Sequence, residues 1–268
     1  MDKEAITSAQ NPRIKDLVLL QSKSKERRSS GRFVVEGQRE VARAITGGFI
    51  PETFFICEKI CRNHDLISGV VEKSGAGIFS VPDTLYKKIA YRNDTEGIVG
   101  IFKSKDISLK NINLSDNPLL IVLESVEKPG NLGAVLRSAD ASGADAVIVC
   151  DPLTDLYNPN VIRASTGAVF SVQCLTCSND ELYSYLQSHN ISIITAQLQD
   201  SKFYYDTDMT KGTALVFGTE DKGLTDYWRV RSDARVRIPM AGITDSLNVS
   251  VSAAILCYEA VRQRRILR

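Results

Sequence analysis

The sequence lacks the features that mark membrane-spanning, exported and metal-binding proteins. Among its 268 residues no apolar stretch approaches the length of a membrane span, and the opening Met-Asp-Lys-Glu-Ala-Ile is neither a signal core nor an Arg-rich transit peptide. Six cysteines form no disulfide framework, and His64 and His189 have no ligand spacing to other residues. We therefore expect a cytoplasmic chain with no membrane segment and no metal site.

Signatures of the common nucleotide cofactors are missing as well. No GxGxxG follows a predicted strand and no Walker A sequence occurs, which disfavours nicotinamide-dependent and P-loop enzymes. Cys174 and Cys177 have the CxxC spacing of zinc and redox sites, but no second matching pair or nearby histidine completes a ligand set. We interpret the cysteines as ordinary reduced thiols.

What is present is a balanced charge with local basic clusters. The net charge is +1, so the sum alone does not indicate a nucleic-acid-binding protein. One short polar segment contains a single acid, Glu26, among the cations Lys23, Lys25, Arg27, Arg28 and Arg32. Such a cluster is often only solvated surface. Because this stretch has little to pack against, we interpret its cations as phosphate contacts.

The first hundred residues alternate between strand-like and helix-like patterns. Asn11 and Pro12 are a cap and a first helical residue, and the apolar residues after them follow helical spacing. The patterns further predict strands over 33–35, 53–57, 78–81 and 97–102, and helices over 38–45, 66–73 and 83–90. We therefore predict a small α/β domain over residues 1–105.

A polar stretch without strong periodicity, residues 106–117, is the predicted linker to a second domain over residues 118–268. A continuous apolar run, typical of a parallel strand buried on both faces, occurs at 119–123, and similar short runs occur at 147–150, 191–195, 214–217 and 234–238. Helical patterns lie between most of them, and a long one over 247–262 ends the chain. This alternation predicts a parallel sheet covered by helices.

Three polar or glycine-rich loops lie next to predicted strand ends of the second domain, where open parallel sheets bind ligands. In the first loop, Asn131 can cap the following helix and Gly133 allows close approach of backbone or ligand. Arg137 lies one turn after Gly133, where a guanidinium can hold a phosphate. The same residues also fit a capped helix with a surface arginine.

The second and third loops likewise allow both a ligand-binding and a purely structural interpretation. Gly218 and Gly223 leave the backbone amides between them free to meet a ligand, and Glu220 can accept from a cation or a hydroxyl. In the third loop, Ser246 and Asn248 have the character of helix-start caps. Taken singly, each loop is explained by a polar turn or a cap.

Taken together, in this order and at this spacing, the three loops resemble the signature motifs of the SpoU (TrmH-like) RNA 2′-O-methyltransferases of the SPOUT superfamily. The motifs read Asn131-x-Gly133-x-x-x-Arg137, Phe217-Gly218-x-Glu220-x-x-Gly223-Leu224, and Ile238-Pro239-Met240-x-Gly242 with Ser246-Leu247-Asn248-Val249-Ser250. The resemblance extends from Leu119 to the C-terminus without a departure inside the motifs. The first half is similar to the ribosomal-protein-like RNA-binding domain of this family, through Ser8-x-x-Asn11-Pro12-x-Ile14-Lys15 and Phe33-Val34-Val35-Glu36-Gly37.

The resemblance implies an α/β fold with a C-terminal SPOUT methyltransferase domain, whose parallel sheet carries a trefoil knot, preceded by a small α/β RNA-binding domain. It implies a homodimer with active sites at the interface, and S-adenosylmethionine as the cofactor. The cofactor-binding residues to which it points are Thr195, Ala196, Gly218, Ile238, Met240 and Leu247.

The implied reaction is attack of a ribose 2′-hydroxyl on the methyl group of S-adenosylmethionine, which requires two aligned reactants. We expect Arg137 to bind the target phosphate and stabilise the developing alkoxide, since an arginine is effectively never neutral. We expect Glu220 to orient Arg137, across subunits in the dimer, and Asn131, Ser246 and Asn248 to complete the polar shell. The residue that accepts the proton stays open.

Structured ribosomal RNA is the expected substrate, because the extra N-terminal domain favours it over transfer RNA by analogy. A tRNA 2′-O-methyltransferase is one alternative. A non-catalytic RNA-binding or ribosome-assembly protein that keeps the fold is another, against which the intact polar motifs argue. Base methylation is a third, and it is not expected to retain the Asn/Arg pair together with the Ser-Leu-Asn segment.

Overall fold

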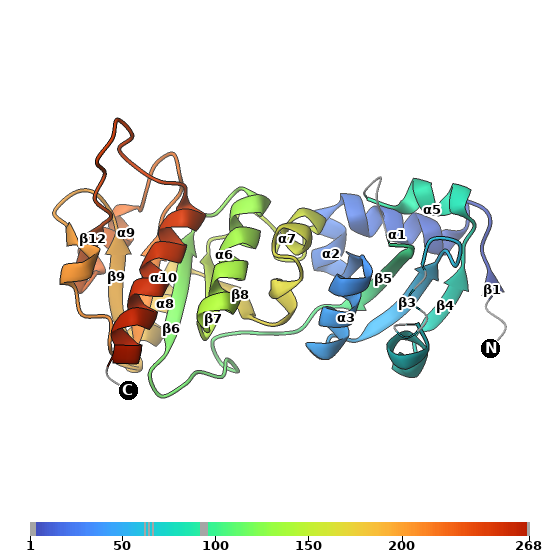
Figure 1. Ribbon diagram of the computed structural model, residues 1–268, viewed down its shortest axis with the longest axis horizontal. Helices are drawn as coiled ribbons and strands as arrows, with labels where there is room; N and C mark the ends of the chain where they lie inside the picture. Colours follow the sequence, from blue (N-terminus) through green and yellow to red (C-terminus); the bar gives the residue numbers. More distant parts are fainter. Residues whose placement is uncertain (1–3, 62, 64, 66, 92–95, 267–268) are drawn as a thin grey trace. The chain divides into compact units, whose positions relative to one another are not determined.

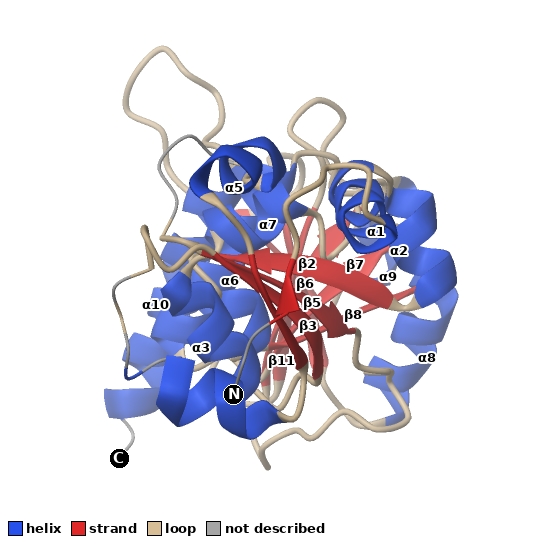
Figure 2. Ribbon diagram, turned by 90° about the vertical axis from the view of Figure 1, so that its right-hand side faces the viewer, coloured by secondary structure: helices blue, strands red, loops and turns tan. Residues whose placement is uncertain are grey.

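The computed structural model describes residues 4–61, 63, 65, 67–91 and 96–266, so His64 and the first residue of the predicted helix 66–73 lie outside the described part. The chain forms two compact units (Figure 1). The first contains Met1–Asp106 and Tyr157–Ser171, and the second contains Ile107–Leu156 and Val172–Arg268. Helices lie outside the strands (Figure 2).

The first unit is built on a mixed sheet in the order β1-β4-β3-β5-β2. Its strands are β1 (Glu4–Ala5), β2 (Arg32–Glu36), β3 (Pro51–Ile56), β4 (Gly77–Ser80) and β5 (Ile98–Lys103). Its helices include α1 (Pro12–Ser22), α2 (Ser24–Ser30), α3 (Gln38–Thr46), α5 (Asp83–Ile89) and α7 (Pro159–Ala164), with short helical turns η1 (Ile67–Val71), η2 (Glu72–Ser74) and η3 (Ala168–Phe170). Strand β5 is antiparallel to β2 and β3, while β4 is parallel to β1 and β3.

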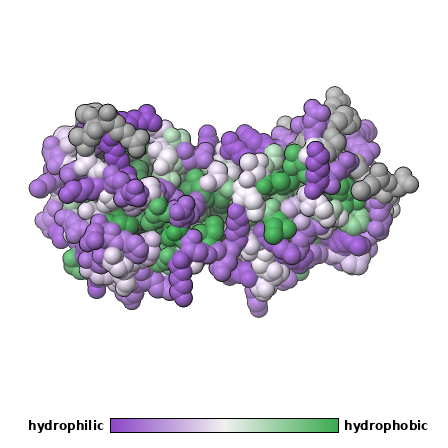
Figure 3. All heavy atoms as spheres, turned by 90° about the horizontal axis from the view of Figure 1, so that it is seen from below, coloured by the Kyte–Doolittle hydropathy of each residue, from purple (hydrophilic) through white to green (hydrophobic). Residues whose placement is uncertain are grey.

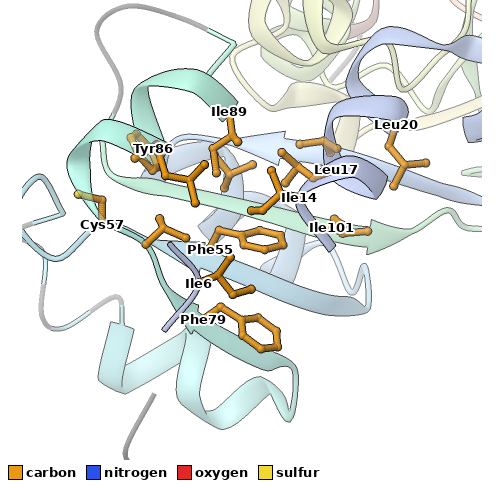
Figure 4. Packing of buried hydrophobic residues seen from close by; sticks show 14 residues of the cluster. Ile6, Ile14, Leu17, Leu20, Phe55, Cys57, Phe79, Tyr86, Ile89 and Ile101 are labelled. Atoms are coloured by element: carbon orange, nitrogen blue, oxygen red, sulfur yellow. The ribbon is translucent and has the colours of Figure 1, made fainter. Parts of the chain in front are cut away.

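Helices α1 and α5 bury apolar side chains on one face of this sheet. Ile14, Leu17 and Leu20 recur at helical spacing along α1 and are at most 1% exposed. They pack with Phe55 and Ile101 of the strands in one cluster (Figure 4). Asn11 caps α1 by accepting from the Arg13 amide at 2.9 Å, which confirms the predicted start of the helix.

An aromatic cluster attaches a distant segment to the first unit. The ring of Tyr157 stacks on Phe33 with centroids 4.2 Å apart and planes at 13°, and Phe170 stacks on the same ring at 5.9 Å. Phe49 meets Phe170 edge to face at 5.1 Å. Residues 157–171, which we expected inside the second domain, therefore belong by their contacts to the first unit.

The second unit has a seven-stranded sheet in the order β10-β12-β9-β11-β6-β7-β8, and all of its pairings are parallel. The strands are β6 (Leu119–Glu124), β7 (Ala146–Cys150), β8 (Gln173–Cys177), β9 (Ser192–Ala196), β10 (Lys202–Phe203), β11 (Thr213–Phe217) and β12 (Ala234–Arg237). The helices are α6 (Pro129–Ser142), α8 (Asn179–Ser188), α9 (Asp226–Arg231) and α10 (Val249–Ile266), with the turn η4 (Tyr204–Asp206). The predicted parallel α/β fold is confirmed, and the knot stays a prediction from the resemblance.

The predicted linker is part of the second unit. Ile107, Leu109, Ile112 and Leu114 are half-buried against its core. The backbone is also held, since the amide of Asn113 donates to the Gln173 side chain at 2.9 Å. Residues 107–114 are thus a packed segment of the second unit.

One face of the protein is mostly polar, and the described cysteines form no cross-links. The face in Figure 3 is largely hydrophilic, with smaller apolar areas between the polar side chains. None of the helices that the structure describes is both long and apolar enough to span a membrane, and none of the described His, Cys, Asp and Glu side chains form a cluster that could hold a metal ion. None of the six cysteines, all of which lie in the described part of the chain, forms a disulfide, and burial raises the pKa of Cys174 to about 12.

Candidate active site

The three motif loops start at one edge of the second sheet. Strands β6 and β11 are parallel neighbours in which Leu123 pairs with Phe217, so both strands end at the same level. The first motif follows β6 and runs into α6, and the second follows β11. The third lies between β12 and α10. Topology alone therefore brings the polar residues of all three motifs together.

A polar cluster forms where the three motifs meet. The carboxylate of Glu220 accepts a hydrogen bond from the side-chain amide of Asn131 at 2.9 Å, and another from the amide of Asn248. The Asn248 amide also reaches the Asn131 oxygen at 3.2 Å. One residue from each motif thus contributes to a single hydrogen-bonded group, and all three are among the residues to which the motifs point.

Lys128 completes this cluster and was missed by the sequence analysis. Its ammonium forms an ion pair with Glu220. The hydrogen bond from Lys128 holds the pKa of Glu220 below its ordinary value, and the same contact raises the pKa of Lys128. Both groups are therefore charged at neutral pH. The available signal was a cation three residues before Asn131, directly before the Pro129 turn.

A cavity of about 500 Å³ lies beside the cluster, at the ends of β9, β11 and β12. Of the predicted cofactor-binding residues, Ala196, Gly218, Ile238, Met240 and Leu247 line it, and the predicted polar residues Ser246 and Asn248 line it as well. Ser246 is exposed, and its hydroxyl donates to Asp245 at 3.4 Å. Thr195 does not line the cavity, because it is fully buried within β9.

The second motif forms a tight loop between two glycines. The backbone groups of Thr219 and Gly223 pair in both directions, at 3.1 and 3.0 Å, which turns the loop back on itself. A Cβ atom on Gly218 would lie 2.1 Å from the carbonyl carbon of Gly223, a distance no side chain tolerates. Gly223 has φ +65°, a left-handed conformation that glycine adopts without strain.

A buried carboxylate fixes the far end of this loop. Glu124, at the end of β6, is 2% exposed and accepts from the Thr225 amide at 2.8 Å and the Thr225 hydroxyl at 2.6 Å. Asn179 donates to the same carboxylate at 3.3 Å and accepts from the Trp228 indole at 2.7 Å. This network joins β6, α8 and α9 beneath the loop, and the sequence analysis did not identify it.

A second cavity of about 640 Å³ lies between the loops that follow β6 and β11. Its walls include Val126, Lys128, Asn131 and Leu153, together with residues 218–223. Residues 218–223 also line the first cavity. The second motif is therefore a wall common to two cavities, and the polar cluster lies at that wall.

Arg137 stands apart from the cluster within one chain. It is exposed on α6 and forms no hydrogen bond or ion pair with another residue of the described chain. Lys128, and not Arg137, forms the ion pair with Glu220. A single chain therefore does not bring together the predicted partners Arg137 and Glu220.

The five predicted cations of the basic segment, residues 23–32, are of two kinds. Arg27 is 5% exposed and donates to the carbonyl oxygens of Leu20 and Gln21 at 2.6 and 3.1 Å. Arg32 forms a two-pronged ion pair with Asp16 at 2.8 and 3.0 Å. These two arginines support the structure of the unit. The other three predicted cations, Lys23, Lys25 and Arg28, are exposed on and beside α2.

Comparison with known families assigns both parts of the sequence. Residues 118–258, more than half of the chain, match the SpoU rRNA Methylase family. Residues 11–100 match the MRM3-like substrate binding domain.

Individual relatives match this chain over most of its length. A 23S rRNA (guanosine-2′-O-)-methyltransferase RlmB of Ralstonia nicotianae is 32% identical, over 81% of this chain and 90% of the relative. A 23S rRNA (uridine(2479)-2′-O)-methyltransferase of Streptomyces viridochromogenes is 29% identical, over 96% and 92%. The AdoMet-bound rRNA methyltransferase of Sinorhizobium meliloti superposes with a TM-score of 0.88 at 28% identity, covering 97% of each chain. The chain therefore belongs to the SpoU rRNA methylase family.

Proposed function

We propose that this protein transfers a methyl group from S-adenosylmethionine to a ribose 2′-hydroxyl of ribosomal RNA. The observation that carries the proposal is the cluster of Asn131, Glu220 and Asn248 at the wall common to two cavities. A methyl transfer between two bound molecules needs two adjacent binding spaces with polar groups where they meet. The relatives named above act on ribosomal RNA, which favours it over transfer RNA.

The first cavity fits the cofactor. Its volume of about 500 Å³ lies in the range of small-molecule sites. Gly218 provides a wall without a side chain, and Ile238, Met240 and Leu247 provide apolar surface. When bound, S-adenosylmethionine supplies an electrophilic methyl group on a sulfonium sulfur.

The polar cluster faces the reacting ribose in this proposal. Because Lys128 keeps Glu220 ionised, the carboxylate is a permanent hydrogen-bond acceptor for a ribose hydroxyl. Asn131 and Asn248 hold that carboxylate in place, and the second cavity gives room to the target nucleotide. In the transfer, the bond from the 2′-oxygen to the methyl group would form as the bond from sulfur to that methyl group breaks. S-adenosylhomocysteine would leave, and the hydroxyl proton would pass finally to solvent.

The active form is a homodimer in this proposal. Arg137 has no partner within the described chain, although an exposed guanidinium is suited to a phosphate or a developing alkoxide. Apolar side chains are exposed along α10, where Val251 and Tyr258 are 46% and 50% accessible. A second copy that covers this surface would present its own Arg137 to the site.

The first unit binds the RNA. Lys23, Lys25 and Arg28 form an exposed basic group suited to phosphates, in the part of the chain that contains the substrate-binding domain. A location in the cytoplasm, where ribosomes work, is part of the same proposal.

Incubation of the purified protein with ribosomal RNA and radiolabelled S-adenosylmethionine tests the proposed activity. A 2′-O-methyl group blocks alkaline cleavage of the adjacent phosphodiester, so we expect the label in alkali-stable dinucleotides. Label in mononucleotides would mean base methylation, and absence of label would support a binding protein without catalysis. Transfer RNA in a parallel reaction is expected to stay unlabelled.

A mixture of two inactive variants tests the composite site. Arg137→Ala and Glu220→Ala should each abolish transfer, and the first should retain cofactor affinity. If each site takes Arg137 from one copy and Glu220 from the other, mixed dimers regain one intact site, giving about one quarter of wild-type activity at random pairing. A mixture as inactive as its components would contradict the composite site.

A further inference from the structure

The first cavity contains cations whose roles the proposed function does not yet assign. Arg229, Arg237 and Lys222 line it, among acidic residues that include Asp221 and Asp245. Arg237 is already engaged, because its guanidinium donates to Ser201 and stacks on Phe203 at 4.6 Å. The side chain of Lys222 is exposed in the loop.

Arg229 is different, because its guanidinium is partly buried and incompletely satisfied. Its Nε is buried and has no hydrogen-bond partner in the described part of the chain. Its ion pair is a long contact of 3.8 Å to Asp226, a residue whose side chain is 94% exposed. A buried donor without a partner costs on the order of 1–3 kcal/mol, so such a group in a cavity points to a ligand.

The backbone of Arg229 is held rigidly at this position. The neighbouring Trp228 is fully buried in the core, and its indole donates to Asn179 at 2.7 Å. The carbonyl oxygen of Arg229 accepts from the Arg235 side chain at 3.1 Å. Helix α9 therefore presents the guanidinium to the cavity from a fixed backbone, which favours binding because little order is lost.

The guanidinium also lies next to the glycine loop of the second motif. A Cβ atom built on Gly223 would be 3.7 Å from the nearer terminal nitrogen of Arg229. The absence of a side chain at Gly223 keeps the space in front of the guanidinium open. A ligand in the cavity can therefore reach both the loop backbone and Arg229.

We propose that Arg229 binds the carboxylate of the amino-acid part of S-adenosylmethionine. This inference rests on the proposed function, since it assumes that the cavity holds that cofactor. The carboxylate is the one anionic group of the molecule, and a planar guanidinium binds a carboxylate through two parallel hydrogen bonds. The ammonium and sulfonium of the same molecule match the acidic lining that Asp221 and Asp245 provide.

Calorimetric titration with two ligands isolates this contact. S-adenosylmethionine and decarboxylated S-adenosylmethionine share the adenosine, the sulfonium and the amine, and differ only in the carboxylate. In the full-length protein, Arg229→Gln should weaken binding of the first ligand about 10- to 100-fold and leave binding of the second unchanged. Arg229→Lys should fall between wild type and Arg229→Gln, because an ammonium keeps the charge and loses the planar fork.

Two control variants complete the design. Arg231→Gln removes a cation from the same helix that stacks on Tyr227 and does not line the cavity, so it should change neither affinity. Equal weakening of both ligands by Arg229→Gln would mean that Arg229 only shapes the cavity, and no weakening would exclude it from the site. If Lys222→Gln, and not Arg229→Gln, selectively weakened binding of S-adenosylmethionine, the cofactor carboxylate would be bound by Lys222 in the loop. Each of these outcomes overturns the inference, whereas a wild-type protein that binds neither ligand contradicts the proposed function itself.

Discussion

At the scale of single residues, the account depends on the charge state of Glu220. The hydrogen bond from Lys128 lowers the pKa of this carboxylate, so it becomes protonated only as the pH falls below its ordinary value of 4.5. The negative charge of Glu220 is therefore fully present throughout the neutral pH range, and it is lost only as the pH falls through the lowered pKa.

A glutamine at this position tests that charge. Glu220→Gln keeps the shape of the side chain and removes a charge-assisted contact, so the methyl-transfer rate should fall about tenfold or more. The loss should be the same factor at about pH 6 and about pH 8, because Glu220 does not titrate between them. Single-turnover rates at both values measure it, and a loss that shrinks towards acid would show that the carboxylate is a titrating base.

At the scale of structural elements, the tight loop of the second motif, between Gly218 and Gly223, is the first to be tested. Gly218→Ala places a Cβ against the backbone of Gly223 and should open the loop, lowering affinity for S-adenosylmethionine by about tenfold or more while the sheet stays folded. Gly130→Ala is the matched control, since a Cβ there meets nothing within 4 Å. Calorimetry and thermal unfolding together measure the effect. Equal cofactor affinity in the two variants would remove Gly218 from the site.

Helix α2 provides a second test at this scale. Replacing Lys23, Lys25 and Arg28 together by Gln should leave stability unchanged and flatten the salt dependence of RNA affinity, by up to about 0.9 in slope for each lost phosphate contact. Arg27→Gln should instead destabilise the unit by about 1–3 kcal/mol, because the buried carbonyl oxygen of Leu20 and the partly buried one of Gln21 lose their donor. Unchanged slopes in the triple variant would mean that these cations are only solvated surface.

The elements also show what the sequence could predict. Continuous apolar runs identified β6, β7 and β11, because strands buried on both faces need them. Shorter runs, which polar residues interrupt, identified β9 and β12. Strand β8, Gln-Cys-Leu-Thr-Cys, was missed because it is partly polar. The motifs identified Asn131, Glu220 and Asn248 as candidate site residues without predicting the hydrogen bonds among them. Neither Lys128 nor Glu124 belongs to a pattern that spacing reveals. Their roles depend on contacts between loops far apart in the sequence.

On the scale of the whole molecule, the division into units is not a simple cut along the chain. Residues 157–171 lie between β7 and β8 in sequence but pack with the first unit through Tyr157 and Phe170. A linear reading assigns such a segment to the domain that surrounds it in sequence. Contacts such as the stacking on Phe33 and the hydrogen bond from Arg43 to the Thr166 carbonyl reveal where it belongs.

Tyr157→Ala tests the importance of this attachment. Loss of the ring stacked on Phe33 should destabilise the first unit by about 1–3 kcal/mol and weaken RNA binding, while affinity for S-adenosylmethionine stays unchanged. Tyr205→Ala, an exposed tyrosine of the second unit, is the control. A variant with wild-type stability and RNA affinity would show that the stacking is incidental.

Mapping 2′-O-methyl groups in total RNA tests the proposed methyl transfer to ribosomal RNA in the cell. Cells with the gene, cells without it, and cells that carry Arg137→Ala in its place would be compared at every nucleotide. The account predicts that a ribose methylation in ribosomal RNA disappears with the gene and is not restored by Arg137→Ala. Ribosomal RNA that is identical in all three, or a lost mark that lies on a base or in transfer RNA, would contradict it.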